Sequence, residues 1–347
     1  MSFLFSKIQP LIYNNESFAD AFETLLLSSD RMKIVSGYIS EESLMELKSI
    51  LDFYREEKKK KFCDLTIGMH HREGFTRPQY EAAKSLGEFL EEYKLGAVRV
   101  CTAFKFHGKV YSFYKDNAPF ASIMGSSNLS NMLESKQWEV DYIFRDNGTL
   151  KELNSLYDDL VSKATKTLLE LPAPAKFLEN HDLLLGRTGV EKLTTNDLES
   201  YKTQRHGVVF EIPLKAEAKS NLNVYFGKGR LAPNGAIRPR PWYEVEIIVP
   251  TTITRLKGYP HSGTVFNAIT DDGWRFKCKV SGQNDKNFRS EDDLKTLGRW
   301  VKGRLEAAGI LEVGQPITEQ MLQKYGRNNL TLSQTKDPET WLLDFSV

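Results

Sequence analysis

The residues best suited to chemistry lie close together in the first half of the chain. His107 and Lys109 form an H-x-K motif, Ser126 and Asn128 belong to a G-S-x-N motif, and Glu139 follows shortly after. An imidazole beside an ammonium suits a phosphate, because the ammonium neutralises the non-bridging oxygens and favours the neutral, nucleophilic imidazole. Ser126 and Asn128 add neutral hydrogen-bond donors for the extra charge of a five-coordinate phosphorus. The pattern therefore predicts attack on a phosphodiester by one half of a catalytic site.

Short apolar stretches place these motifs on or beside strands. Neighbouring strands are favoured at residues 106–114, 121–124 and 138–144. Alternate side chains of a strand share a face, so His107 and Lys109 are expected to project the same way. Glu139, on the third strand, is expected to hold the imidazole tautomer through its other ring nitrogen. The alternative is that His107 and Glu139 are solvent-facing strand residues and that the G-S-x-N motif is a turn.

The rest of the first half alternates helix and strand patterns. Helical periodicity covers residues 17–28, 41–61, 78–93 and 150–171. Buried strands are favoured at residues 33–38, 63–69 and 97–102. This order predicts an α/β sandwich around a mostly buried sheet. The lysines at 58–61 are expected to form a solvated helix end.

His70 and His71 are the other pair of residues that suggests a function. Adjacent residues on a strand point to opposite faces, which disfavours joint metal ligation. We expect them in a loop after the strand at 63–69, where they either line the entrance to the site or serve only the loop.

Composition sets the limits for the whole chain. Its 347 residues favour two domains, and its net charge of +1 means that any nucleic-acid surface must come from local clustering. The three cysteines form no C-x-x-C pair, which predicts neither a disulfide framework nor a zinc site. We find no signal peptide and no apolar stretch near the roughly 20 residues that span a bilayer. We therefore expect a cytoplasmic protein with no membrane partner.

The pattern of apolar residues changes after the proline-containing segment 171–176, which is typical of a linker. Short alternating apolar runs occur at residues 208–212, 223–226, 243–249, 264–268, 274–280 and 341–345. A single helix is expected at 294–308. Many short strands separated by Gly, Pro and Asn predict a small β barrel or sandwich.

Two polar segments of this second half are candidates for contact with nucleic acid. No acidic residue lies between Glu217 and Glu244, and glycines and prolines there predict an exposed arm rather than a strand. The candidates on this arm are Lys228, Arg230, Asn234, Arg238 and Arg240. The second segment offers Gln283, Asn284, Asp285, Lys286 and Asn287. Arginine suits guanine edges, Asn234 adenine and Asp285 a cytosine amine, whereas the alternative is two solvated hairpin loops.

The first-half motifs resemble the phospholipase D superfamily, whose signature is H-x-K, a downstream acid and G-S-x-N. The acid that usually comes five residues after the lysine would fall on Tyr114, and Asp116 is out of phase. The nuclease branch often places a glutamate after the G-S-x-N strand instead, so the resemblance assigns the acid's role to Glu139. It also implies a homodimer, because a complete site needs two such halves and this chain has one H-x-K motif. One His107 would form a phosphohistidine and the partner's would protonate the leaving oxygen, with no metal required.

The whole chain resembles the restriction endonucleases of the BfiI and NgoFVII type, especially the NgoFVII/NgoAVII group. The resemblance is carried by GYIS, FHGKVYSF, GSSNLS and QWEVDYIF in the first half and by YEVEIIVP, FNAITDDG and FKCKVSGQNDKN in the second. It implies an α/β phospholipase D-like nuclease domain at 1–175, a linker at 176–190 and a plant-B3-like β pseudobarrel at 191–347. The pseudobarrel would grip a short, GC-rich site in double-stranded DNA with arms at 228–242 and 275–289.

Members of this group can depend on a separate ATPase subunit. This chain has no Walker-type G-x-x-x-x-G-K-[ST] motif, so ATP would act only through such a partner. Two other functions stay open from the sequence. One is a lipid phosphodiesterase with the same chemistry, and the other is a DNA-binding regulator whose first domain is inactive.

Overall fold

The computed structural model describes residues 2–133, 135, 137–180, 182–231 and 237–347. The chain forms two compact units, Met1–Glu179 and Asn180–Val347, which divide within the predicted linker 176–190. Within these described ranges, no helix is both long and apolar enough to cross a membrane.

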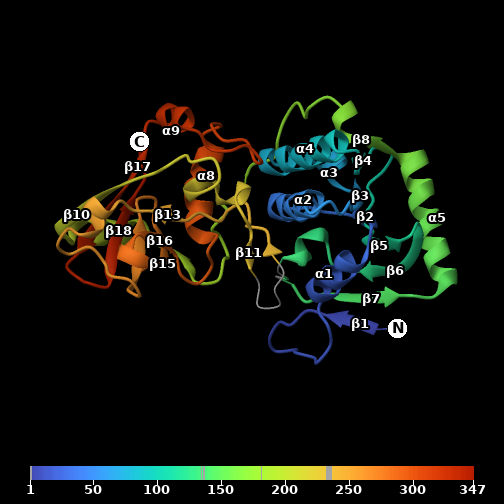
Figure 1. Cartoon of the computed structure of the whole chain (residues 1–347), viewed down its shortest axis with the longest axis horizontal. Helices are drawn as coiled ribbons and strands as arrows, with labels where there is room; N and C mark the ends of the chain where they lie inside the picture. The colour runs from blue at the N-terminus through green and yellow to red at the C-terminus, as the bar shows by residue number, and fades with distance from the viewer. Residues whose placement is uncertain (1, 134, 136, 181, 232–236) are drawn as a thin grey trace. The chain divides into compact units, whose positions relative to one another are not determined.

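The first unit is built around a mixed eight-stranded sheet with the order β1-β7-β6-β5-β2-β3-β4-β8 (Figure 1). Its strands are β1 (Ser2–Phe5), β2 (Arg31–Ser36), β3 (Phe62–Ile67), β4 (Gly96–Cys101), β5 (Val110–Lys115), β6 (Ala118–Gly125), β7 (Val140–Phe144) and β8 (Thr165–Thr167). Strands β2, β3 and β4 run parallel, and the remaining neighbours are antiparallel. The predicted α/β sandwich is confirmed.

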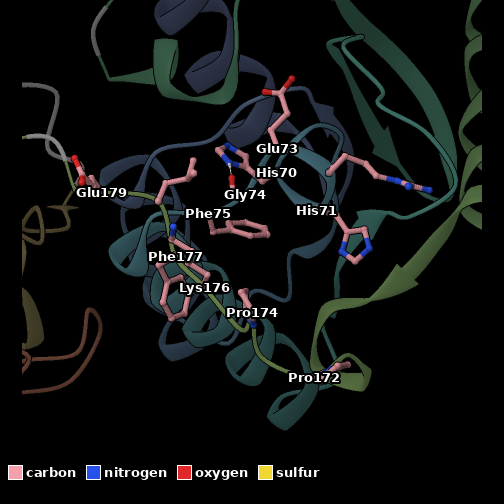
Figure 2. A pocket seen from close by; sticks show the side chains of 12 residues that line it. His70, His71, Glu73, Gly74, Phe75, Pro172, Pro174, Lys176, Phe177 and Glu179 are labelled. Atoms are coloured by element: carbon pink, nitrogen blue, oxygen red, sulfur yellow. Dashed lines mark hydrogen bonds between the residues drawn. The ribbon is translucent and has the colours of Figure 1, made fainter.

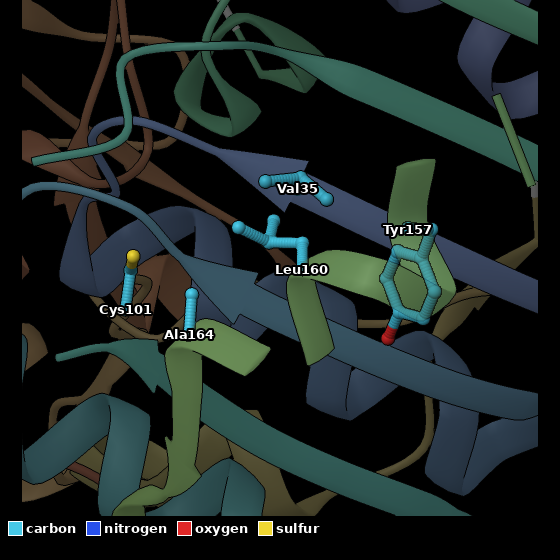
Figure 3. Close-up of a cluster of buried hydrophobic side chains, with 5 residues drawn as sticks. All are labelled: Val35, Cys101, Tyr157, Leu160 and Ala164. Atoms are coloured by element: carbon cyan, nitrogen blue, oxygen red, sulfur yellow. The ribbon is translucent and has the colours of Figure 1, made fainter. Parts of the chain in front are cut away.

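Helices cover both faces of this sheet. They are α1 (Phe18–Ser28), α2 (Glu41–Glu56), the single turn α3 (His70–Glu73), α4 (Arg77–Glu92) and α5 (Asn147–Ala164), with 3₁₀ turns at Leu129–Met132 and Leu168–Glu170. Helix α5 lies on the opposite side of the sheet from α2 and α4 (Figure 1). Its Tyr157, Leu160 and Ala164 recur at helical spacing and pack against Val35 of β2 and Cys101 of β4 (Figure 3).

The basic run after α2 differs from the prediction. The helix ends at Glu56, Lys58 has a φ of 58°, and Lys61 is buried rather than solvated. The Lys61 ammonium donates to the carbonyls of Leu26, Leu27 and Ser29 at the end of α1, at 2.8, 3.1 and 2.5 Å. Carbonyls at a helix C-terminus are left partly unpaired by the helix itself and carry partial negative charge, so a cation placed there stabilises them. Burial lowers the pKa of Lys61 to about 8.

The second unit contains a curled half-barrel sheet with the strand order β10-β17-β18-β14-β15-β16-β13, and β9 pairs with β15. Its strands are β9 (Val190–Lys192), β10 (Arg205–Pro213), β13 (Ile247–Ile248), β14 (Val265–Thr270), β15 (Trp274–Ser281), β16 (Asn287–Ser290), β17 (Asn329–Thr335) and β18 (Thr340–Asp344). A separate hairpin joins β11 (Arg230–Leu231) to β12 (Ile237–Arg238). The helices are α6 (Thr195–Thr203), α7 (Thr251–Thr254), α8 (Thr296–Ala307) and α9 (Glu319–Tyr325).

This architecture agrees with the predicted B3-like β pseudobarrel, although two predicted strands are wrong. Residues 223–226 lie in a 3₁₀ helix, Asn221–Phe226, because the Asn223 side chain bonds the backbone of Ile317 and Glu217 rather than a strand neighbour. Of the strand predicted at 243–249, only Ile247–Ile248 pairs, with β16. Residues 221–226 and 243–246 nevertheless supply buried side chains, which explains their apolar pattern.

Candidate functional site

The H-x-K motif lies just before β5 rather than on it. His107 is exposed and Lys109 is 6% exposed. The Lys109 ammonium lies 3.0 Å from Nε2 and 3.3 Å from Nδ1 of His107, and it also donates to the His107 carbonyl at 2.9 Å. The predicted strand at 106–114 therefore begins too early, but the two side chains do lie together. Burial lowers the pKa of Lys109, while Glu139 and Asp141 oppose that shift by favouring its charged form.

Glycines at the carboxyl ends of two parallel strands make room for this motif. Gly68 follows β3, and a Cβ there would lie 1.9 Å from the carbonyl oxygen of Phe106. Gly37 follows β2, and a Cβ there would lie 3.2 Å from Cδ2 of His107. The segment that carries His107 is also bonded to the end of β3, because the Phe106 amide donates to the Gly68 carbonyl at 3.1 Å. The imidazole is therefore seated at the strand ends, where α/β sheets commonly bind ligands.

The G-S-x-N motif follows β6 and is fixed by β7. Ser126 is exposed, and its hydroxyl accepts from the Val140 amide at 3.0 Å. Ser127 is buried and donates its amide and hydroxyl to Asp141, at 3.0 and 2.6 Å. Asn128 accepts the Tyr38 amide through Oδ1 at 3.1 Å. Because that oxygen is used, the Asn128 amide nitrogen is left as the donor end of the side chain.

Tyr38 connects the two motifs. Its ring meets the His107 ring edge-on at 5.5 Å, and its amide holds Asn128. Its hydroxyl donates to Glu73 at 2.8 Å, and Glu73 also pairs with Lys105 at 3.0 Å. Sequence reasoning missed Tyr38, although it belongs to the GYIS stretch and ends the strand predicted at residues 33–38.

Glu139 lies immediately before β7 and is half-buried. Within the described part of the chain, its carboxylate has no hydrogen bond to His107; it acts electrostatically on Lys109 instead. The role of tautomer-holding acid therefore stays a prediction for Glu139. Asp141, two residues later, is the buried acid that sequence reasoning missed, and burial raises its pKa. Asp116 lies in the turn at the far end of β5 from His107.

His70 and His71 have different environments. The His70 ring accepts the Ile39 amide at Nε2, 3.3 Å, and contacts the Gly74 carbonyl at Nδ1, 3.0 Å. An amide only donates and a carbonyl only accepts, so this ring is neutral with its proton on Nδ1. Burial lowers the pKa of His70. His70 lies in α3 and not in a loop, and its ring meets Tyr38 edge-on at 5.5 Å, so it supports the site from behind.

A cavity of about 570 Å³ lies beside α3 (Figure 2). It is lined by His71, Arg72, Phe75 and the end of the first unit, including Pro174 and Phe177. Next to Phe177, the Leu178 amide donates to the Phe75 carbonyl at 2.8 Å. The segment after the last helix of the first unit is thus attached to the turn that carries His70.

The first arm of the second unit is partly a hairpin. Lys228 and Arg238 are exposed, whereas Asn234 lies outside the described residues. Arg230 and Arg240 are not isolated cations: both contact the Glu244 carboxylate, at 2.7 Å for Arg240. In the sequence, Glu244 served only to mark the end of the segment without acidic residues. Its pairing with Arg230 and Arg240 was therefore not predicted.

The second arm is the turn between β15 and β16. Gln283 and Asn284 are exposed, and the Asn284 carbonyl accepts from Thr254 at 2.8 Å. The Asp285 carboxylate accepts the Ser262 amide at 2.7 Å and lies 3.2 Å from His261, so it braces the turn. Lys286 and Asn287 are half-buried, and Asn287 donates to Glu246 at 3.3 Å.

Comparison with known families covers both units. The NgoFVII restriction endonuclease N-terminal PLD domain matches residues 16–171, and the NgoFVII C-terminal B3-like DNA-binding domain matches residues 197–336. The chain belongs to the NgoFVII family of restriction endonucleases. As a member of the NgoFVII family it is a site-specific DNA endonuclease, with a phospholipase D-like nuclease domain and a B3-like DNA-binding domain.

Solved structures match about half of the chain at low identity. NucT from Helicobacter pylori is 15% identical with a TM-score of 0.32, and the match covers 47% of this chain and 98% of NucT. Nuc from Salmonella typhimurium, a phospholipase D family member, is 14% identical with a TM-score of 0.33, covering 48% and 95%. A phosphatidylserine synthase from Haemophilus influenzae Rd KW20 is 15% identical with a TM-score of 0.36. The match covers 50% of this chain and 41% of the synthase. No curated protein matches the chain.

Proposed function

We propose that this NgoFVII-family chain hydrolyses duplex DNA through a covalent phosphohistidine on His107. The observation that carries the proposal is the Lys109 ammonium 3.0 Å from the exposed His107 imidazole, together with Tyr38, which contacts both His107 and Asn128. A ring nitrogen of His107 forms a bond to phosphorus as the bond from phosphorus to the leaving oxygen breaks. Lys109 and the Asn128 amide nitrogen neutralise the charge that grows on the phosphoryl oxygens.

A second copy of the chain completes the reaction. The partner subunit's His107 protonates the leaving oxygen, then takes a proton from the water that displaces the phosphohistidine nitrogen. Exposed apolar side chains flank the half-site and support such an interface: Phe104 precedes His107, and Met124 and Val140 adjoin Ser126, with exposures of 49%, 41% and 39%. Exposed apolar residues grouped around a polar centre are typical of an association surface. We assign Glu139 the acid's role, in support of Lys109 and the imidazole.

The chemistry that we propose requires no metal ion. Three or more His, Cys, Asp or Glu side chains do not gather as a metal site within the described part of the chain. A separate ATPase subunit, where one takes part, would act on the accessibility of DNA and not on the chemical step.

Cleavage of plasmid DNA in EDTA tests this function, with and without a candidate ATPase subunit. Wild type is expected to give discrete fragments and a phosphohistidine that can be trapped on His107, whereas His107→Ala gives neither. His71→Ala is the matched control, because His71 lies in the same unit outside the half-site. A strict requirement for Mg²⁺, or hydrolysis of phospholipid only, contradicts the proposal.

Mixing the two proteins tests the shared site. If both copies of His107 are needed, an excess of His107→Ala added before assembly lowers the activity with the square of the wild-type fraction. A linear decrease would show that each chain acts alone. Light scattering on the same samples gives the mass of the assembly.

A further inference from the structure

The inference concerns the arginines at the base of the second unit's two arms, and it rests on the proposed reading of DNA by this unit. Glu244 is 2% exposed, and both Arg230 and Arg240 contact its Oε1 atom. Arg240 also reaches Glu246 at 3.4 Å. One buried carboxylate therefore holds two guanidinium groups that would otherwise repel each other.

Glu246 connects this pair to the other arm. Its Oε1 accepts the Asn287 side-chain amide at 3.3 Å, and its Oε2 receives Arg240. Gly282 leaves room for this contact, because a Cβ there would lie 2.9 Å from the Asn287 amide nitrogen. Arg240 of the first arm and Asn287 of the second thus share the Glu246 carboxylate.

Arg289 belongs to the same cluster. Asn287 and Arg289 alternate with the buried Phe288 and Ser290 on β16, so they share a face. Arg289 and Arg240 are like-charged neighbours of Arg230, whose pKa is lowered chiefly by burial and supported by Glu244 and Glu246. Arg230, Arg240 and Arg289 thus form a compact set of guanidinium groups.

This cluster contains buried polar atoms that lack hydrogen-bond partners among the described residues. They are Nε of Arg240, Oδ1 of Asn287 and Nε of Arg289. A buried polar atom without a partner costs about 1–3 kcal/mol, so the cluster of the free chain leaves polar groups unsatisfied. A rearrangement of these side chains on DNA would let them pair, and a base-pair edge offers both acceptors and donors, whereas a phosphate only accepts.

We propose that Arg230, Arg240, Arg289 and Asn287 form one base-reading site in the major groove, and that Glu244 and Glu246 are its positioning residues. The two carboxylates hold the arginine forks in place before DNA arrives and keep the two arms in register. Arginine forks bind guanine bidentately, so the site reads at least one guanine and prefers it over the other bases. Neither carboxylate contacts DNA itself.

The test uses the full-length chain and a pool of duplexes with a randomised centre. Wild type first selects a sequence from the pool, and affinities are then measured for that duplex and for an unselected one. Glu244→Gln is expected to reduce the preference between them by about 10- to 100-fold, which corresponds to one or two lost base contacts. Binding to the unselected duplex and the salt dependence are expected to stay as in wild type, because no phosphate contact is removed.

Glu191→Gln is the matched control. Glu191 pairs with Arg275 at the other end of β15, both partners being exposed, and its loss is expected to leave the preference unchanged. If Glu244→Gln fails to fold, Glu246→Gln carries the test, because Glu246 is 27% exposed and lies on the surface of the cluster. A double variant of Glu244→Gln with Arg240→Lys is expected to lose no more preference than the stronger single variant, since the loss of Glu244 already releases the Arg240 fork.

Equal losses of affinity for both duplexes would show a merely structural role and overturn the inference. The inference also fails if Glu244→Gln and Glu246→Gln both discriminate as well as Glu191→Gln does. If wild type selects no sequence at all, the proposed reading of DNA fails first, and the inference falls with it.

Discussion

The candidate nuclease half-site and the arginine cluster both gather cations, but they restrain those cations differently. In the half-site, the reactive His107 is exposed and its neighbour Lys109 is buried beside it. In the cluster, Arg230 and Arg240 are already paired with a buried carboxylate. Covalent catalysis needs a group that can change its bonding, whereas recognition of bases needs groups that keep their geometry. In our proposal the half-site is completed by a second copy of the chain, whereas carboxylates of the same chain hold the arginine cluster in place.

The largest effect expected on the chemical side is that of His107→Ala. Removing a nucleophile costs on the order of 10⁴-fold or more in cleavage rate, because no other group forms the covalent intermediate. Gel-shift affinity for DNA is expected to change little, since the reading surface lies in the other unit. Cleavage of plasmid by the variant within tenfold of wild type would break the contrast between the two regions.

Asp141→Asn is expected to have the next largest effect. Asp141 accepts both hydrogen bonds from Ser127, which lies between Ser126 and Asn128. Asparagine keeps one acceptor oxygen, so the Ser127 hydroxyl must turn to accept from the new amide nitrogen and both charge-assisted hydrogen bonds are lost. Displacing catalytic groups by about 1 Å costs on the order of 100-fold in rate. Asp116→Asn, at the far end of β5, serves as control and is expected to cleave normally. Unchanged cleavage by Asp141→Asn would show that the motif is positioned by its own turn.

The difference between the two regions also explains how far the sequence could predict them. The half-site was found because H-x-K and G-S-x-N are short motifs at strand ends, and the structure brings His107, Lys109 and Asn128 together through Tyr38. Contacts that support these motifs were missed where they come from other segments. Asp141 and Tyr38 carry no local signature, because only the folded sheet brings them beside the motif.

The reading surface was harder to predict for the same physical reason. Composition correctly marked residues 228–240 as basic, but the partners of Arg230 and Arg240 lie at Glu244 and Glu246, outside the acid-free segment. The prediction for the lysines at 58–61 is wrong for a similar reason. Lys61 is buried because its ammonium binds carbonyls at the end of α1, more than thirty residues earlier in the sequence. Charge patterns in sequence report which residues are present, and pairing at a distance decides which of them face solvent.

Within the second unit, Arg240→Lys and Lys228→Ala are expected to separate base recognition from electrostatic attraction to the DNA backbone. Lysine keeps the charge of Arg240 but loses the fork, so preference for the selected duplex falls by about tenfold while the salt dependence stays. Lys228 is exposed, and its removal lowers affinity for every duplex a few-fold and the salt slope by about 1. Titrations at several salt concentrations measure both. Identical behaviour of the two variants would mean that Arg240 is only a phosphate contact.

The smallest expected effect concerns acid sensitivity in the nuclease unit. The pKa of His70 is lowered from 6.5 by burial, so the unfolded chain binds its proton more tightly than the folded chain does. Stability is therefore complete above pH 6.5 and falls as the pH drops from there toward the lowered folded value. Each tenfold difference in proton affinity between the two states corresponds to about 1.4 kcal/mol of lost stability.

His70→Gln is expected to remove this slope, because glutamine does not titrate, while lowering stability at neutral pH through the lost contacts to Ile39 and Gly74. Urea unfolding of the first unit between pH 5 and 8, followed by fluorescence, measures both changes, with His206→Gln in the other unit as control. Because His70 contacts Tyr38, which contacts His107, cleavage is expected to decline over the same pH range in wild type more than in His70→Gln. A cleavage profile that is identical in the two proteins would show that the exposed half-site does not depend on this buried histidine, and that its geometry is set by the H-x-K and G-S-x-N segments alone.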